Sequence, residues 1–259
     1  MSIRKKILAI SIGPVLVLGV ITLLFILTMV KSSLMDEVQD ALKGTAAATL
    51  AAYDQNTGDY LESTNGDIWK GSYNISKSES LVDRIKENTG MDVTFFYGNK
   101  RIMTSALDKK GNRILGSEAG ERVVNQVIKG KKPFFSTNVS LDGTRNYGYF
   151  IPVYQNGTTD QVIGMVFVGT NKAKKDAIVN KILGSIMMAL LVVMLLCIVT
   201  AMRMAASISK NIKNSVAVVG KLADGDLNVW VDEKLLKRKD EIGDLSRGTQ
   251  LECSPMKLS

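Results

Sequence analysis

Four side chains on strand-like, largely apolar stretches could bind a small anion: Tyr97, Arg101, Tyr147 and Tyr149. A guanidinium group binds a carboxylate through two parallel, charge-assisted hydrogen bonds, and nearby hydroxyls can add to them. Tyrosine rings can close over the rest of a small ligand while each keeps a polar tip. These residues predict a site for a small carboxylate. The alternative is that the tyrosines are ordinary strand residues with solvated hydroxyls and that Arg101 pairs with a surface acid.

Other kinds of chemistry have little support in the composition. The chain has no histidine, which excludes His-ligated metals and haem and every nucleophile activated by a histidine base. The carboxylates are scattered, and the sequence has neither a Gly-rich phosphate loop nor a Ser-elbow motif. The net charge of +8 is spread along the chain, which argues against nucleic-acid binding. We therefore expect a protein that is not an enzyme and that holds no metal or cofactor.

The stretch that carries Arg101 is expected to form a β-hairpin. Residues 93–97 and 101–105 are rich in β-branched and aromatic side chains, and a Gly-Asn-Lys sequence at 98–100 separates them. A Gly-Asn turn between two such runs is typical of a hairpin. Because side chains alternate between the two faces of a strand, Arg101 and Met103 are expected on the same face.

Further strands and helices are predicted around this hairpin. Apolar periodicity and flanking Gly, Pro and Asn residues indicate the order helix, short helix, two strands, helix, three strands. The helices are expected at residues 31–57, 78–88 and 117–129, with Ser117 as the N-cap of the last, and the three later strands at 133–139, 144–153 and 161–170. This order predicts an α+β fold, a five-stranded antiparallel sheet with helices packed on it.

The helix predicted over residues 31–57 carries a stripe of mostly small residues at alternating spacings of four and three. The stripe consists of Leu34, Val38, Ala41, Thr45, Ala48 and Ala52. Small side chains let a long helix lie close to another surface, so the stripe is expected against either the sheet or a partner helix. Because this helix continues the apolar run before it, it is also expected to act as a mechanical lever.

Two uncharged apolar runs, residues 7–30 and 182–202, are each long enough to cross a bilayer as a helix. Three basic residues precede the first run, which by the positive-inside rule places residues 1–6 in the cytoplasm. Two spans then put both termini in the cytoplasm and residues 31–181 outside the cell, as a multi-pass protein of the cell membrane. A cleaved signal peptide is the alternative for the first run, although such apolar segments usually have about 7–15 residues.

The region after the second run carries a helical seam and two short motifs. Apolar and small residues repeat at spacings of three and four over residues 205–222, which predicts a coiled-coil seam. The motifs Gly225-Asp226-Leu227 and Asp240-Glu241-Ile242-Gly243-Asp244-Leu245 follow it. In residue type and spacing they resemble those of the HAMP signal-relay domain. The resemblance implies that residues 203–250 form a parallel homodimer, with two helices per chain joined by an extended connector. The relay residues it implies are Gly225, Asp226, Leu227, Asp240, Glu241, Ile242, Gly243 and Leu245.

Three stretches resemble parts of single Cache domains, the PAS-like extracellular modules of bacterial chemoreceptors and sensor kinases. They are residues 92–105 (DVTFFYGNKRIMTS), 146–153 (NYGYFIPV) and 162–169 (VIGMVFVG). The resemblance implies that a small molecule, often a carboxylate or an amino acid, binds on one face of the sheet. The pocket candidates carried over on this resemblance are Tyr97, Arg101, Thr104, Tyr147 and Tyr149. Strand alternation does not allow all five to share one face.

The order of helix, Cache, helix and HAMP resembles a methyl-accepting chemotaxis protein. This resemblance implies a homodimeric membrane receptor that binds a small extracellular ligand and passes a conformational signal through HAMP. Residues 251–259 break the helical pattern, so we expect a receptor truncated before its signalling domain. The chemotaxis kinase and adaptor would then be partners of a full-length form only. The alternatives are the input half of a sensor histidine kinase or cyclic-dinucleotide enzyme, and a free-standing membrane protein that binds a ligand.

Overall fold

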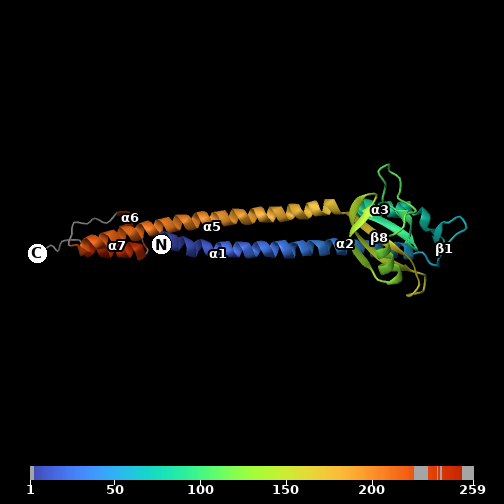
Figure 1. The fold of residues 1–259 in the computed structure, drawn as a ribbon, viewed down its shortest axis with the longest axis horizontal. Coiled ribbons are helices and arrows are strands. Elements are labelled where there is room, and N and C mark those ends of the chain that lie inside the picture. Colours follow the sequence, from blue (N-terminus) through green and yellow to red (C-terminus); the bar gives the residue numbers. More distant parts are fainter. Residues whose placement is uncertain (1–2, 225–232, 238, 240, 253–259) are drawn as a thin grey trace. The chain divides into compact units, whose positions relative to one another are not determined.

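The computed structural model describes residues 3–224, 233–237, 239 and 241–252. The chain forms two compact units, one of Ile26–Gly184 and the other of Met1–Phe25 together with Ser185–Ser259. The first unit holds all the strands in the described part of the chain, and the second is built from helices there (Figure 1).

The centre of the first unit is a five-stranded antiparallel sheet with the strand order β5-β4-β8-β7-β6. Its strands are β4 (Asp92–Tyr97), β5 (Lys100–Thr104), β6 (Phe134–Leu141), β7 (Thr144–Tyr154) and β8 (Val162–Asn171). They are rich in β-branched and aromatic residues, which fit the pleated surface of a sheet. The predicted α+β class and antiparallel sheet are confirmed, and each strand boundary lies within two residues of its predicted place.

The helices of this unit include η1 (Ile26–Val30), α2 (Lys31–Asp54), α3 (Glu79–Thr89), α4 (Glu121–Val123), η3 (Val124–Lys129) and the start of α5 (Lys172–Ala223). α3 ends at Gly90, whose φ of 69° is a left-handed conformation that glycine adopts without strain. The predicted helix over 117–129 is wrong at its start, since helical structure begins at Glu121 and Gly120 is the N-cap in place of Ser117. The residues before Gly120 run along the edge of β5 instead.

A second, three-stranded sheet was not predicted from the sequence. It consists of β1 (Tyr60–Glu62), β2 (Ile68–Lys70) and β3 (Tyr73–Asn74), followed by the 3₁₀ turn η2 (Ile75–Lys77). Figure 1 shows β1 at the end of this unit opposite the start of α5. The Gln155 side chain ties this sheet to β7, because it accepts from the Tyr60 backbone N–H at 2.7 Å and donates to the Tyr60 carbonyl at 3.0 Å. Strands this short carry too few residues for a periodic signal.

A β-bulge in the β4–β5 hairpin changes which side chains share a face. Phe95 pairs with Met103, but Phe96 pairs with Arg101, so Ile102 is an extra residue in β5. An extra residue shifts the alternation by one position. The prediction that Arg101 and Met103 share a face is therefore wrong: Met103 packs with Phe95 in one core, and Arg101 lines a cavity with Phe96.

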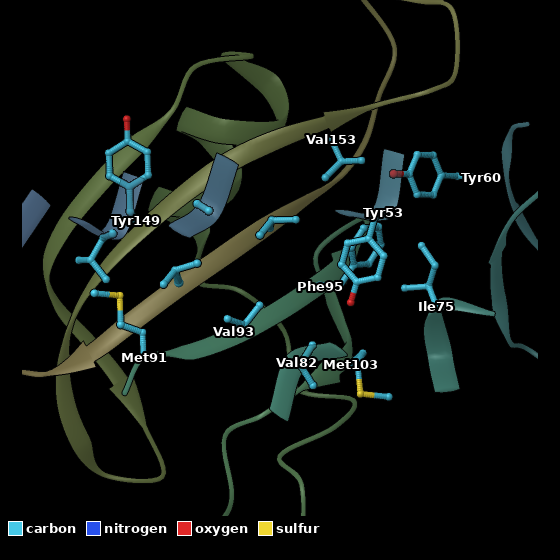
Figure 2. Close-up of a cluster of buried hydrophobic side chains, with 14 of the residues drawn as sticks. Tyr53, Tyr60, Ile75, Val82, Met91, Val93, Phe95, Met103, Tyr149 and Val153 are labelled. Carbon is cyan, nitrogen blue, oxygen red and sulfur yellow. The ribbon is translucent and has the colours of Figure 1, made fainter. Parts of the chain in front are cut away.

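The face of the sheet that α2 covers forms the larger core, here called the helix-side core. α2 contacts β7 and β8, and the buried members of the core include Leu42, Tyr53, Val93, Phe95, Met103 and Val166. The rings of Tyr53 and Phe95 meet edge to face with centroids 5.2 Å apart, and Figure 2 shows them with Tyr60 and Ile75 at one end of the cluster. A smaller core on the other face is built around Phe96, Phe150, Met165 and Phe167. We call it the cavity-side core.

The stripe of α2 that faces the sheet overlaps the predicted one only in part: Val38 packs against the helix-side core, and the alternative contact of the predicted stripe with a partner helix stays a prediction. The buried residues of α2 are Leu42, Ala46, Thr49 and Tyr53, whereas Ala41 and Ala48 of the predicted stripe are exposed. Both stripes have helical spacing, so periodicity alone does not choose between them. The larger Leu42 and Tyr53 side chains decide the orientation, because they bury more apolar area than alanines would.

The described helices of the second unit include α1 (Ile3–Phe25), most of α5, α6 (Glu233–Leu236) and α7 (Glu241–Glu252). Two helical stretches, Lys5–Asp54 and Lys172–Lys221, are long and apolar enough to cross a membrane by length and composition. Large apolar side chains along them are well exposed, for example Leu18 at 66% and Leu195 at 61%. An exposed surface of this kind suits lipid better than water.

The predicted relay residues fall partly outside the described part of the chain. Gly225, Asp226, Leu227 and Asp240 lie outside the described residues, while Glu241, Ile242, Gly243 and Leu245 belong to α7. α7 itself begins at Glu241. The assignment of residues 203–250 to a HAMP domain stays a prediction.

Candidate functional site

A cavity of about 550 Å³ lies on the sheet face opposite α2. Its floor comes from β4, β7 and β8, and its sides from β6 and from the segment that leads into α4. A volume of this size suits a small organic ligand. The cavity holds one of the five pocket candidates predicted from the sequence, Arg101.

The chain after the hairpin returns along the outer edge of β5, beside Arg101. The Arg101 backbone N–H donates to the Ser117 carbonyl and the Gly116 N–H donates to the Arg101 carbonyl, both at 2.9 Å. The Ala119 N–H then donates to the Asn99 carbonyl at 2.8 Å. These bonds hold residues 116–119 beside the strand, so Glu118 and Ala119 border the cavity next to Arg101.

The Arg101 guanidinium places a poorly compensated positive charge in this cavity. The residue is 7% exposed, and within the described residues Nη1 donates one hydrogen bond, to the Ile114 carbonyl at 3.4 Å, while Nε has no partner. Burial lowers the pKa of Arg101, because the charged form loses hydration, and the charge of Asp92 acts in the opposite direction. Asp92 is itself paired with Lys86 at 2.8 Å. A buried cation with an unpaired N–H donor fits a ligand that carries an acceptor and a negative charge.

Aromatic rings form most of the buried wall of the cavity. Phe96, Phe150 and Phe167 are at most 3% exposed, and the Arg101 Cζ lies 5.3 Å from the centre of the Phe96 ring. The ring centroids of Phe150 and Phe167 are 4.8 Å apart, and those of Phe134 and Phe150 are 6.4 Å apart. Such distances are typical of aromatic contacts. The wall offers apolar contact to the body of a ligand.

Apart from Arg101 and the half-buried Ser136, the polar and charged side chains of the lining are exposed. Thr137, Asn138 and Glu118 are exposed, and so is Arg122, whose Cζ lies 5.4 Å from the Phe134 ring. These groups are hydrated without a ligand, so their pairing with a ligand yields less free energy than a bond to a buried group. The buried lining therefore combines one cation with apolar rings.

The other four predicted pocket residues lie elsewhere. Tyr97 packs against the helix-side core, and Tyr147 and Tyr149 belong to it. Figure 2 shows Tyr149 away from the Tyr53 end of that core. Thr104 is buried, and its hydroxyl is already engaged: it lies 2.7 Å from the Thr94 hydroxyl and accepts from the Ala106 N–H at 3.1 Å. The structure therefore does not bring the five residues together.

Tyr147 lies where the sheet meets the start of α5. Its hydroxyl donates to Asp176 Oδ1 at 2.5 Å, and burial, followed by this contact with Asp176, raises the pKa of Tyr147 to about 12. The hydroxyl is therefore a donor at neutral pH. The Phe135 ring stacks on Tyr147 with a centroid distance of 6.3 Å. Lys172 Nζ lies 5.2 Å from the Tyr147 ring and donates to the Thr137 carbonyl at 3.1 Å.

Sequence reasoning missed the phenylalanines of the cavity wall. A signal for them existed in strand alternation, since Phe150 takes the face opposite Tyr147 and Tyr149. The tyrosines are predicted because their hydroxyls can bond a ligand, yet they face α2. The phenylalanines carry no reactive group, so their residue type alone does not distinguish a ligand wall from an ordinary core.

The geometry of the cavity suits the binding of a small anion. Among the described residues, no group of three or more His, Cys, Asp or Glu side chains is placed to hold a metal ion. The lining pairs no nucleophile with a base, and its one carboxylate, Glu118, is exposed. What the geometry can do is desolvate a small anion, pair it with Arg101 and cover its apolar part.

Residues 73–182 match the family described as Single cache domain 3 (sCache_3_3). The matched range includes every strand of the five-stranded sheet and the whole cavity lining. The first unit therefore contains a Cache-like domain of α+β type, flanked by two apolar helical stretches that are candidate membrane spans.

Two solved structures are similar to this chain at low identity. An extracellular ligand-binding receptor from Desulfohalobium retbaense is 14% identical to this chain, with a TM-score of 0.40. The match covers 57% of this chain and 25% of the receptor chain. The sensory domain of the Campylobacter jejuni chemoreceptor Tlp3 is 11% identical with a TM-score of 0.37, covering 67% of this chain and 64% of its own. The chain thus spans less than two thirds of each. None of the curated protein sequences matches it.

Proposed function

We propose that this chain is the input part of a transmembrane chemoreceptor, in which the Cache-like domain binds a small anionic ligand outside the cell. The observation that carries the proposal is the buried Arg101 guanidinium, whose Nε lacks a partner inside a cavity of about 550 Å³. A carboxylate, free or as part of an amino acid, supplies the acceptors that this group lacks. The role proposed is sensing, with no catalysis.

The proposed topology has residues 7–30 and 182–202 as the two spans, with both termini in the cytoplasm. The two apolar helical stretches support it by length and composition, and the basic residues before the first span support the orientation. Residues 31–181 would then form the extracellular domain. This arrangement places the cavity where a dissolved ligand can reach it.

Contacts between the cavity wall and α5 offer a route for the signal. Phe135 and Thr137 of β6 line the cavity. Phe135 stacks on Tyr147, which donates to Asp176, and the Thr137 carbonyl accepts from Lys172. Asp176 and Lys172 both lie in the first turns of α5. A ligand that moves β6 therefore changes the contacts that hold this helix. The ligand must bind the two arrangements with different affinity for this to shift their populations.

The proposed output of α5 is a HAMP-type relay in a homodimer. α7 supplies the second helix that such a relay needs, and Glu241, Ile242, Gly243 and Leu245 lie in it. In a longer form of the receptor, a chemotaxis kinase and its adaptor would receive the signal. A sensor kinase or cyclic-dinucleotide enzyme could use the same input half, and a longer gene product would distinguish these outputs by its C-terminal domain.

The ligand-binding part of the proposal is tested by isothermal titration calorimetry of the full chain in lipid nanodiscs. A panel of sodium carboxylates and amino acids is titrated into the wild type, Arg101→Gln and Arg113→Gln. We expect at least one carboxylate to bind, with affinity falling about tenfold or more in Arg101→Gln, because a hydrogen bond to a charged group contributes about 1.5–3 kcal/mol.

Arg113→Gln is the matched control, since Arg113 is outside the cavity lining and pairs with Asp83 at 2.5 Å. Its affinity should equal that of the wild type. Undiminished binding in Arg101→Gln would remove Arg101 from the site and with it the observation that carries the proposal.

The transmission part is tested with spin labels on Ser33→Cys and Lys181→Cys in a background without Cys197 and Cys253. Pulsed electron resonance reports the distance between the labels with and without the bound carboxylate. We expect the ligand to shift this distance, and Tyr147→Phe to reduce the shift while leaving affinity unchanged. A shift of equal size in Tyr147→Phe would exclude the Tyr147 hydroxyl from the route.

A further inference from the structure

Two glycines that face each other across β7 and β8 determine where the Phe167 ring lies. Gly148 pairs with Gly169 in the sheet. A Cβ on Gly169 would lie 2.4 Å from the Phe167 Cζ, and a Cβ on Gly148 would lie 2.5 Å from its Cε2 and 2.8 Å from Val139 Cγ2. No side chain fits at these distances, so the ring lies directly against the backbone of both strands.

The position of this ring shapes the floor of the cavity. Phe167 is 1% exposed and lines the cavity with Phe150, whose ring centroid is 4.8 Å away. With any larger residue at either glycine, the Phe167 ring would have to move away from the sheet. Because the cavity lies on that side, its depth depends on the two glycines.

The buried lining also limits the charge of the ligand. Arg101 is the one charged side chain of the lining that is buried, and the second cation, Arg122, is exposed beside Phe134. A second carboxylate deep in the cavity would meet phenylalanine rings and lose its hydration without a partner, which is costly. An apolar body at the same place removes apolar surface from water, which is favourable.

We infer that the cavity takes a monocarboxylate with an aromatic or comparably apolar body, and that Phe167, seated on Gly148 and Gly169, is the residue that selects this body. The inference rests on the proposed function, because it assigns the chemical class of the ligand at the same site. The carboxylate pairs with Arg101 and the body packs on Phe167 and Phe150.

Calorimetry on the full chain in nanodiscs tests this with three probes: acetate, phenylacetate and succinate. We expect phenylacetate to bind at least about tenfold more tightly than acetate or succinate. The reason is that burying an aromatic ring contributes more free energy than a tenfold change in affinity requires. Equal or tighter binding of acetate or succinate, still lost in Arg101→Gln, would overturn the inference and leave the proposed function intact. Failure of all three acids to bind would overturn the inference, while the proposed function would still be decided by the wider panel of carboxylates and amino acids.

Three variants test the role of the floor. Phe167→Leu and Gly148→Ala should each lower the phenylacetate-to-acetate affinity ratio several-fold. Phe95→Leu is the matched control, because Phe95 is fully buried on the other face of the sheet in the helix-side core. Its ratio should match the wild type even though it loses stability. A wild-type ratio in Phe167→Leu would show that another part of the wall selects the ligand.

Discussion

Replacing Arg101 by methionine should make the ligand-free protein more stable and unable to bind its ligand. The Arg101 side chain is almost fully buried, its Nε has no partner and its one hydrogen bond is long, at 3.4 Å. Methionine keeps a similar length and apolar surface but carries no donor that needs a partner. Residues kept for binding often reduce stability in this way.

The size of the effect follows from three contributions. Removing a buried, unsatisfied polar group is favourable by about 1–3 kcal/mol. The lost contact of the guanidinium with the Phe96 ring, 5.3 Å from Arg101 Cζ, costs up to about 1 kcal/mol. The bond to the Ile114 carbonyl is too long to contribute much. The net gain is about 1 kcal/mol, which corresponds to a rise in Tm of about 2–4 °C for a domain of this size.

The assay is thermal unfolding of the full chain in nanodiscs, followed by tryptophan fluorescence. In a Trp230→Phe background, Trp69 of β2 is the one remaining tryptophan, so the signal reports the Cache-like domain. A carboxylate at 100 times its Kd should stabilise the wild type by about 2.7 kcal/mol and leave Arg101→Met unchanged. The Tm values of the two proteins should therefore exchange order when ligand is added.

Arg113→Met is the control with the opposite expected sign. The Arg113 guanidinium donates to both Asp83 carboxylate oxygens, at 2.9 and 2.5 Å, and to the Thr104 carbonyl at 2.7 Å. Removing a paired arginine leaves its acceptors without a donor, so the Tm should fall. A fall in the Tm of Arg101→Met by 2 °C or more, like that of the control, would refute the reasoning, because it would show that Arg101 is a structural residue.

Three further substitutions test the fold. Gly164→Ala places a Cβ 2.0 Å from the Phe96 carbonyl oxygen, so it should lower the free energy of unfolding by about 2 kcal/mol or more as β4 and β8 separate. Gly44→Ala, in open space on α2, should instead raise it by up to about 1 kcal/mol. Equal Tm values for the two variants would contradict these expectations. Hydrogen bonds from Arg113 lower the pKa of Asp83, so this pair stabilises the fold above the ordinary Asp pKa of about 4 and ceases to do so as the pH falls through the lowered value. Asp83→Asn should then reduce the Tm at pH 7 by the equivalent of about 1 kcal/mol or less, given its partial exposure. The difference should vanish once the pH has fallen below the lowered pKa of Asp83, and an unchanged difference in acid would contradict the assignment.

Much of the fold was predictable because its signals are local. The strands and α3 followed from alternation, helical periodicity and turn residues within a few positions of each other. The helix predicted over 117–129 failed at its start because residues 116–119 bond to the edge of β5, a partner that no local pattern reveals. The small sheet β1–β3 was missed for a related reason, since strands of two or three residues hold together through tertiary contacts such as that of Gln155 with Tyr60.

The candidate site was predictable only in part. The sequence predicts Arg101, because a guanidinium group with hydroxyls nearby binds a carboxylate, and Arg101 lines the cavity. It also predicts Tyr147 and Tyr149 for their hydroxyls, but their strand turns them toward α2. The aromatic wall is not predicted, since phenylalanines at alternate strand positions are typical of any core.

The sequence by itself determined the class of this protein: an α+β module with a five-stranded antiparallel sheet between two apolar helical stretches. Local periodicity and hydropathy are enough for that, because they depend on near neighbours. The tertiary structure alone decided which side chains meet. Because Ile102 is an extra residue in β5, Arg101 lies on the same face of the sheet as Phe96 and opposite Met103. The glycine pair Gly148 and Gly169 on β7 and β8 leaves room for the Phe167 ring. Both depend on register between strands, which is a property of the folded sheet.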